Sequence, residues 1–139
     1  MRGKQGQVAG LGESTSGLDR RFYVGRDIVA VDFDGVICQY VEGPVAGEFG
    51  DVIPGAKRAI AALRSMGRKV IVYTVREEID LVLAYLDAHG ILVDGVTNRK
   101  PRAHVYVDDR AITFNGNWDS ILPAIVSFEP YYYRKDSDD

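Results

Sequence analysis

Acidic side chains follow two short apolar runs that lie far apart in the sequence. Asp32 and Asp34 follow the first run, and Asp108 and Asp109 follow the second. If both runs are strands of one parallel sheet, four carboxylates gather at one edge, where two like charges about 4 Å apart repel by about 1 kcal/mol in bulk water. A divalent cation removes this repulsion. Carboxylate oxygens, together with water and a substrate phosphate, suit Mg²⁺, so the pattern predicts a magnesium site.

A hydroxyl group and an ammonium group are expected at the same edge. Thr74 directly follows a third apolar run, and Lys100 lies in the loop 97–102, just before the run that leads to Asp108. In an open parallel sheet, ligands bind beyond the carboxyl ends of the strands. We therefore expect one cleft that contains the four carboxylates, the Thr74 hydroxyl and the Lys100 ammonium group.

The elements that must position these residues alternate between strands and helices. Continuous apolar runs, typical of strands buried on both faces, occupy 28–31, 69–73 and 105–107, and a weaker candidate lies at 93–96. Helical spacing and helix-end residues predict helices at about 54–67, 77–89 and 118–128. This alternation predicts an α/β fold, a Rossmann-like three-layer α/β/α arrangement with an open parallel sheet and helices on both of its faces.

The last helix and the residues after it are the least constrained part of this prediction. Pro123 is tolerated only near the first turn of a helix, which favours a helix start near Ser120. Trp118 is predicted to be a core anchor under the last strand. The run Tyr131–Tyr133 either packs on the body of the protein or forms a dimer contact.

Composition narrows the class of protein. The chain has 139 residues, which suits one domain, and 17 Lys and Arg against 20 Asp and Glu give a net charge of −3, so no global basic surface indicates nucleic-acid binding. The single cysteine, Cys38, excludes an intramolecular disulfide framework. No apolar run approaches the roughly 20 residues of a membrane helix, and the N-terminus has no apolar signal region. We expect a cytoplasmic protein with a flexible tail (1–26), a catalytic domain (27–129) and a C-terminal tail (130–139).

Four short segments resemble the motifs of the haloacid dehalogenase (HAD) superfamily of phosphotransferases. They occur in the order of that family and cover roughly residues 28–110. The segment Val31–Val36 resembles the first motif, Tyr73–Thr74 the second, Lys100–Pro101 the third and Val107–Asp109 the fourth. Asp32 and Asp34 before Gly35 are by themselves a moderate indication of this resemblance, whereas the four segments in the family's order are a specific one.

The resemblance implies a phosphatase that works through an aspartyl-phosphate. Asp32 would be the nucleophile, and Asp34 would protonate the leaving oxygen and later deprotonate water, for which it must carry a proton at the working pH. Thr74 and Lys100 would hold the phosphoryl oxygens.

The resemblance also implies how the metal is held. Mg²⁺ would be bound by the Asp32 carboxylate, the Asp34 backbone carbonyl and the acidic pair, with Asp109 favoured as the direct ligand and Asp108 acting through water.

The segments between the motifs are too short for the cap domain that this family often inserts. A capless cleft must be closed by the substrate, by a partner subunit in a homo-oligomer, or by the segment 39–49. Four arginines near the motifs predict a basic rim suited to a nucleotide, a nucleic-acid end or another large phosphorylated substrate; they are Arg76, Arg99, Arg102 and Arg110.

Two other functions fit part of the pattern. A phospho-accepting module similar to bacterial receiver domains also combines an acidic cluster, a threonine and a lysine, but its acceptor aspartate lies on a middle strand, whereas here the middle strand ends in Thr74. A catalytically silent binding protein with the same fold is the third reading, and no motif is missing that would favour it.

Overall fold

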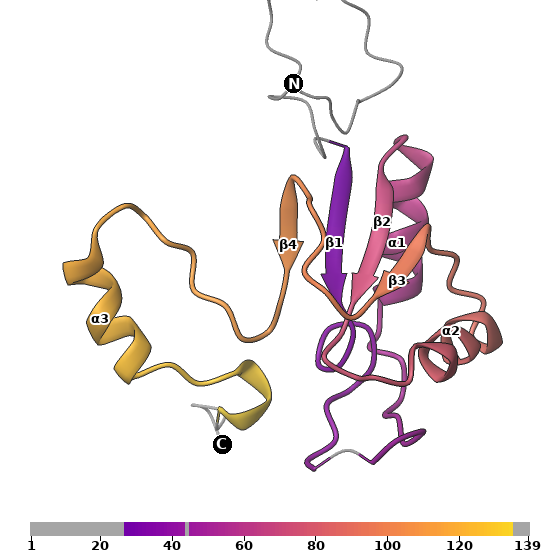
Figure 1. The fold of residues 1–139 in the computed structure, drawn as a ribbon, viewed down its shortest axis with the longest axis horizontal. Helices are drawn as coiled ribbons and strands as arrows, with labels where there is room; N and C mark the ends of the chain where they lie inside the picture. The colour runs from indigo at the N-terminus through magenta and orange to yellow at the C-terminus, as the bar shows by residue number, and fades with distance from the viewer. Residues whose placement is uncertain (1–26, 44, 135–139) are drawn as a thin grey trace, which may run out of the picture.

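The sheet has four strands, all parallel, in a computed structural model that describes residues 27–43 and 45–134. The predicted tail 1–26 and the last residues, 135–139, lie outside the described residues. The strands are β1 (Ile28–Asp32), β2 (Lys69–Tyr73), β3 (Gly95–Thr97) and β4 (Val105–Val107). Their order across the sheet is β3-β2-β1-β4, so β1 lies in the interior between β2 and β4 (Figure 1). This is the predicted Rossmann-like α/β fold.

The helices fall close to their predicted ranges. They are α1 (Ala56–Ser65), α2 (Ile79–Ala88) and α3 (Trp118–Val126), followed by a short 3₁₀ helix, η3 (Tyr131–Tyr133). Beyond the end of α1, Gly67 adopts φ 87°, a left-handed conformation that favours glycine and ends the helix there.

The core lies on one face of the sheet. Val29 pairs in register with Val70, and Val31 with Val72, so these four side chains project from the same face. Ile60 of α1 joins them, as do Val82 and Leu86 of α2, and all are buried. Burial against these helices therefore explains the four valines, and Ala30, which points to the opposite face, is buried as well. The core holds the carboxyl ends of β1 and β2 in place.

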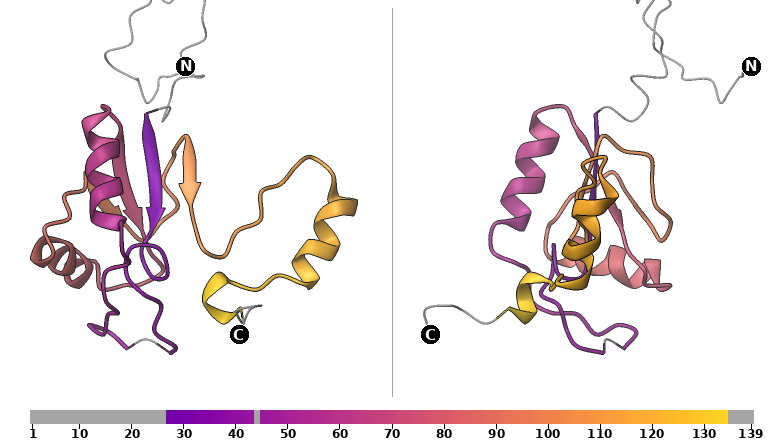
Figure 2. Two further views of the ribbon diagram at one scale, coloured as in Figure 1. Left: turned by 180° about the vertical axis from the view of Figure 1, so that it is seen from behind. Right: turned by 90° about the vertical axis from the view of Figure 1, so that its left-hand side faces the viewer.

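Helix α3 differs from its prediction. Figures 1 and 2 show it separated from the sheet at the end of a long connection from β4. The Trp118 side chain is 66% exposed, so the prediction that it anchors the core is wrong. The helix also begins at Trp118 and not near Ser120, because the Asn117 side chain accepts a hydrogen bond from the Asp119 backbone N–H (2.9 Å) and caps it there. Pro123 consequently lies inside the helix.

The segments between the motifs contain no cap domain within the described residues. Between β1 and α1 the chain forms turns and two isolated bridges, Asp34 to Cys38 and Cys38 to Val52, and α2 is the only helix or strand between β2 and β3. No helix in the described part of the chain is long and apolar enough to cross a membrane.

Candidate active site

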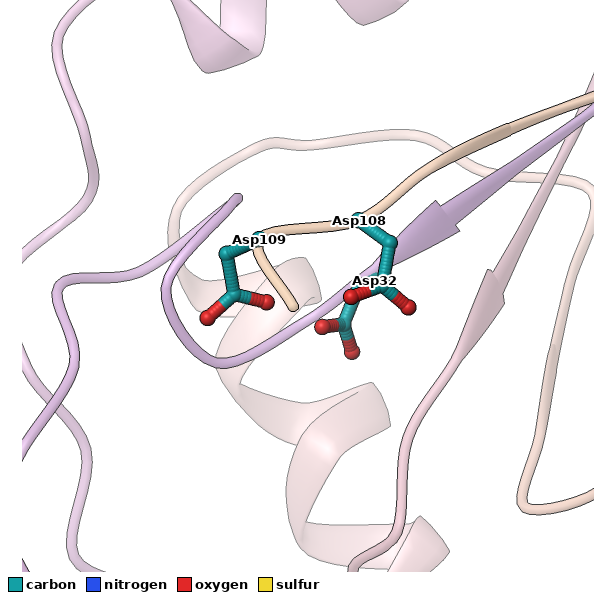
Figure 3. A group of neighbouring side chains, drawn as sticks. All are labelled: Asp32, Asp108 and Asp109. Carbon is teal, nitrogen blue, oxygen red and sulfur yellow. The ribbon is translucent and has the colours of Figure 1, made fainter. Parts of the chain in front are cut away.

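Three carboxylates converge at the carboxyl ends of β1 and β4. Asp32 is the last residue of β1, and Asp108 and Asp109 follow β4, its neighbour in the sheet. One oxygen from each of the three lies within 4.8 Å of the others (Figure 3). The adjacency of two parallel strands is what brings together residues so far apart in the sequence. The predicted convergence of these three residues is therefore present, in an arrangement that could hold a metal ion.

Asp32 is surrounded by groups that disfavour its negative charge. Burial, together with the nearby carboxylates of Asp109 and Asp108, raises the pKa of the Asp32 carboxyl to about 9. The Phe33 backbone N–H, which donates to Asp32 Oδ1 at 2.8 Å, opposes this effect. In the metal-free protein Asp32 is therefore protonated near neutral pH. A cation at this position would replace the proton.

The oxygens of the acidic pair are not equivalent. Asp108 accepts a hydrogen bond at each oxygen, from the Tyr73 hydroxyl (2.6 Å) and from the Arg110 backbone N–H (2.7 Å). Asp109 accepts one at Oδ2 from the Tyr132 hydroxyl (2.5 Å), but its Oδ1 is buried and has no hydrogen-bond partner among the described residues. A buried oxygen without a partner is costly, and a cation would satisfy it. The carboxylate donor set suits Mg²⁺, and the free oxygen favours Asp109 over Asp108 as the direct ligand.

Asp34 forms an ion pair that the sequence did not predict. Its two carboxylate oxygens accept hydrogen bonds from Arg76 Nε (2.8 Å) and Nη2 (2.9 Å), and the same guanidinium also donates to Glu78 (3.1 Å) and to the Glu48 carbonyl (2.8 Å). The Phe49 ring lies against it, with the guanidinium carbon 4.5 Å from the ring centroid. These partners raise the pKa of Arg76, chiefly through the hydrogen bonds to Asp34.

The Arg76 prediction must accordingly be corrected. We expected Arg76 on an exposed rim, but only 7% of it is exposed. Arg76 instead links Asp34, which lies two residues beyond β1, to the Glu48 carbonyl and to Glu78, which directly precedes α2. The cause is the path of the chain after β1. It brings Asp34 and the Glu48 carbonyl within hydrogen-bond distance of Arg76, which lies three residues beyond the end of β2.

The remaining predicted residues surround a cleft of about 830 Å³. Thr74 is buried at its wall, and its hydroxyl oxygen accepts a hydrogen bond from the Arg76 backbone N–H (3.0 Å). Lys100 lines the cleft with its ammonium nitrogen 4.8 Å from the centroid of the Tyr106 ring. Among the four predicted rim arginines, Arg99 and Arg110 line the cleft, whereas Arg102 is absent from its lining.

Tyrosines are the functional candidates that sequence reasoning missed. Tyr73 and Tyr132 each donate a hydrogen bond to one aspartate of the acidic pair, and Tyr40 lines the cleft. A signal was present for two of them: Tyr73 directly precedes Thr74 in the second motif, and Tyr132 lies in a run of three tyrosines. No local pattern, however, indicates which carboxylate a tyrosine hydroxyl will reach.

Comparison with known proteins supports the fold and goes no further. No protein-family model matches the chain, and no curated protein matches it. A solved structure of a conserved protein from Bacteroides thetaiotaomicron is similar, with a TM-score of 0.53 and 23% sequence identity over 78% of this chain and 98% of that chain. At this identity the likeness shows the open-sheet α/β fold alone.

The raised pKa of Asp32 predicts how the stability of the metal-free protein depends on pH. Between the unfolded value near 3.8 and the folded value near 9, the folded state holds a proton that the unfolded state has lost. The free energy of unfolding should therefore decrease as pH rises from about 5.5 to about 8.5, and Asp32→Asn should flatten this slope. Urea unfolding in a chelating buffer measures it. A slope that Asp32→Asn leaves unchanged would contradict the assignment.

Proposed function

We propose that the protein is a Mg²⁺-dependent phosphomonoester hydrolase of the HAD type, without a cap domain, that acts through an aspartyl-phosphate. The observation that carries this proposal is the convergence of Asp32, Asp108 and Asp109, with the buried Asp109 Oδ1 left unsatisfied, beside a cleft lined by Thr74 and Lys100. The ordered motifs found in the sequence agree with this arrangement.

Asp32 would carry the covalent step. One of its carboxylate oxygens attacks phosphorus, the bond from phosphorus to the ester oxygen breaks, and the leaving oxygen takes a proton from Asp34. Water, deprotonated by Asp34, then attacks phosphorus and breaks its bond to Asp32, so both aspartates return to their starting states. Thr74 and Lys100 would orient the phosphoryl oxygens and offset their charge. Asp32, Asp109 and the Asp34 backbone carbonyl would hold Mg²⁺. When bound, the ion would neutralise charge on the transferring phosphoryl group.

The ion pair between Asp34 and Arg76 bears on the proton transfer. As long as Arg76 donates to both carboxylate oxygens of Asp34, neither oxygen is free to exchange a proton with the leaving group. Asp34 lines the cleft, whereas the buried Arg76 is not part of its lining. The proposed proton transfer therefore requires that Asp34 leave this pair and take up a proton from solvent before it can protonate the leaving oxygen.

The cleft suits a large phosphorylated substrate. Arg99, Lys100 and Arg110 provide cations along its lining, and such cations would bind further phosphates of a nucleotide or a nucleic-acid end. Because residues 27–43 and 45–134 contain no cap domain, the cleft stays open to a substrate too large to be enclosed. A nucleotide or a nucleic-acid end is therefore the substrate class that we propose.

Turnover with and without metal tests the proposal. Full-length protein is incubated with p-nitrophenyl phosphate, nucleoside monophosphates and end-phosphorylated oligonucleotides, first with Mg²⁺ and then with a chelator. We expect many product molecules per chain with Mg²⁺, near-complete loss on chelation and recovery when Mg²⁺ is restored. A single equivalent of phosphate retained on the protein would favour the receiver-like module. No metal-dependent product from any substrate would favour a silent binding protein.

A further inference from the structure

The C-terminal segment returns to the acidic centre. Figures 1 and 2 show the chain turning back after α3, so that η3 lies near the segment that follows β1. Tyr131 and Tyr133 donate hydrogen bonds to that segment, to the Gly35 carbonyl (2.8 Å) and to Glu42. Tyr132 donates to Asp109 (2.5 Å), which follows β4. Between the alternatives that the sequence left open, the structure places this run on the body of the protein.

Tyr132 is held from several sides. Its ring stacks on Tyr40, with centroids 4.5 Å apart and planes inclined by 10°. Its hydroxyl oxygen accepts a hydrogen bond from Arg110 Nε (3.0 Å), which directs the hydroxyl proton toward Asp109. A tyrosine fixed by both its ring and its hydroxyl has little freedom to follow a movement of Asp109. The carboxylate therefore adapts to the tyrosine.

Gly35 leaves the space that this contact needs. It adopts φ 86°, and a Cβ built on it would lie 2.4 Å from Asp109 Oδ2 and 3.0 Å from the Tyr132 ring. Any other residue would displace the Asp109 carboxylate from Tyr132. The glycine of the first motif thus has a role beyond its turn: it lets Asp109 Oδ2 and Tyr132 meet, which leaves Oδ1 as the free atom.

We propose that Tyr132 is a positioning residue that restricts Asp109 to a single metal-facing oxygen and thereby favours Mg²⁺ over Ca²⁺. The inference rests on the proposed function, because it takes the acidic centre to be the metal site. Mg²⁺ requires close to octahedral geometry and accepts one oxygen from each carboxylate, whereas Ca²⁺ tolerates a carboxylate that binds through both oxygens. As long as the Tyr132 hydroxyl is bonded to Oδ2, Asp109 can bind a metal ion through Oδ1 alone and not through both oxygens.

Calorimetric titration of full-length protein with Mg²⁺ and Ca²⁺ tests this inference. The informative variant is Tyr132→Phe, which keeps the ring and its stack on Tyr40, and the matched control is Tyr133→Phe, which removes a neighbouring hydroxyl that contacts Glu42. We expect Tyr132→Phe to weaken Mg²⁺ binding about tenfold, the usual order for a residue that orients a ligand, and to weaken Ca²⁺ binding less or to strengthen it. The control should bind both ions as the parent protein does.

Two results would overturn the inference. If Tyr132→Phe leaves the ratio of Mg²⁺ to Ca²⁺ affinity unchanged, either because both affinities persist or because both fall together, Tyr132 has a structural role alone. An equal change in the Tyr133→Phe control would show that any lost hydroxyl has the same effect.

Asp109→Asn separates this failure from failure of the proposed function. If Asp109→Asn weakens Mg²⁺ binding while Tyr132→Phe keeps the ratio, only the inference about Tyr132 is wrong. If Asp109→Asn binds Mg²⁺ as the parent does, the acidic centre is not the metal site, and both proposals are wrong.

Discussion

Asp32→Asn is expected to reduce the rate of phosphomonoester hydrolysis by at least about a thousandfold, because an amide cannot form the aspartyl-phosphate. The fold should persist. In the metal-free protein, burial and the neighbouring carboxylates raise the pKa of Asp32 to about 9, so the native side chain is already neutral near pH 7, and asparagine replaces it with little change in shape or charge. Steady-state kinetics with p-nitrophenyl phosphate and Mg²⁺ measure the loss, and thermal unfolding checks the fold.

Asp87→Asn is the matched control for this experiment. It makes the same chemical change at an exposed position on α2, away from the cleft, and should leave both the rate and the melting temperature unchanged. If Asp32→Asn kept a rate within about tenfold of the parent rate, the nucleophile would have to lie elsewhere, and the assignment of the first motif would fail.

Arg76→Met is expected to lower the free energy of unfolding by about 3 kcal/mol, the order found when one partner of a buried ion pair is removed. The variant leaves Asp34 without its two charge-assisted hydrogen bonds, and it also removes the link from Arg76 to the Glu48 carbonyl. The urea midpoint should therefore fall. Equilibrium urea unfolding measures the stability loss.

Two further variants make the Arg76 result specific. Arg99→Met removes an exposed cation from the same cleft and should change stability by no more than about 0.5 kcal/mol. Adding Asp34→Asn to Arg76→Met should recover part of the loss, because the unpaired carboxylate is then gone. A stability loss below about 1 kcal/mol for Arg76→Met would mean that solvent replaces the guanidinium and that the pair is not a structural link.

The alignment of strand ends was predictable because it follows from local patterns and one geometric rule. Val29, Val31, Val70 and Val72 are buried on the helix-covered face, and Ala30 and Ile71 on the opposite face complete two continuous apolar runs that can be recognised in the sequence. Parallel strands end at the same edge, so the residues that follow them, Asp32, Thr74 and Asp109, had to lie near one another. The fold class and the centre of the candidate site therefore needed no tertiary information.

Side-chain partners between distant loops were decided by the tertiary structure alone. Arg76 and Asp34 are 42 residues apart, and Tyr132 and Asp109 are 23 apart. A guanidinium or a hydroxyl can reach any acceptor that the chain path brings near it, and loop paths leave no periodic signal in the sequence. For the same reason, the sequence could suggest Arg76 as a rim residue while the structure buries it.

The amino-acid sequence by itself determined that α3 is a helix with apolar residues, but not where that helix packs. The spacing of Trp118, Leu122 and Ile125 is the same whether a helix packs on a sheet or lies apart from it. In this protein all three residues are exposed. Helical spacing is set by local backbone geometry, whereas burial depends on the path of the connection from β4 to α3. The sequence thus determined the strands, the helices and the acidic centre, and the tertiary structure decided which side chains support that centre.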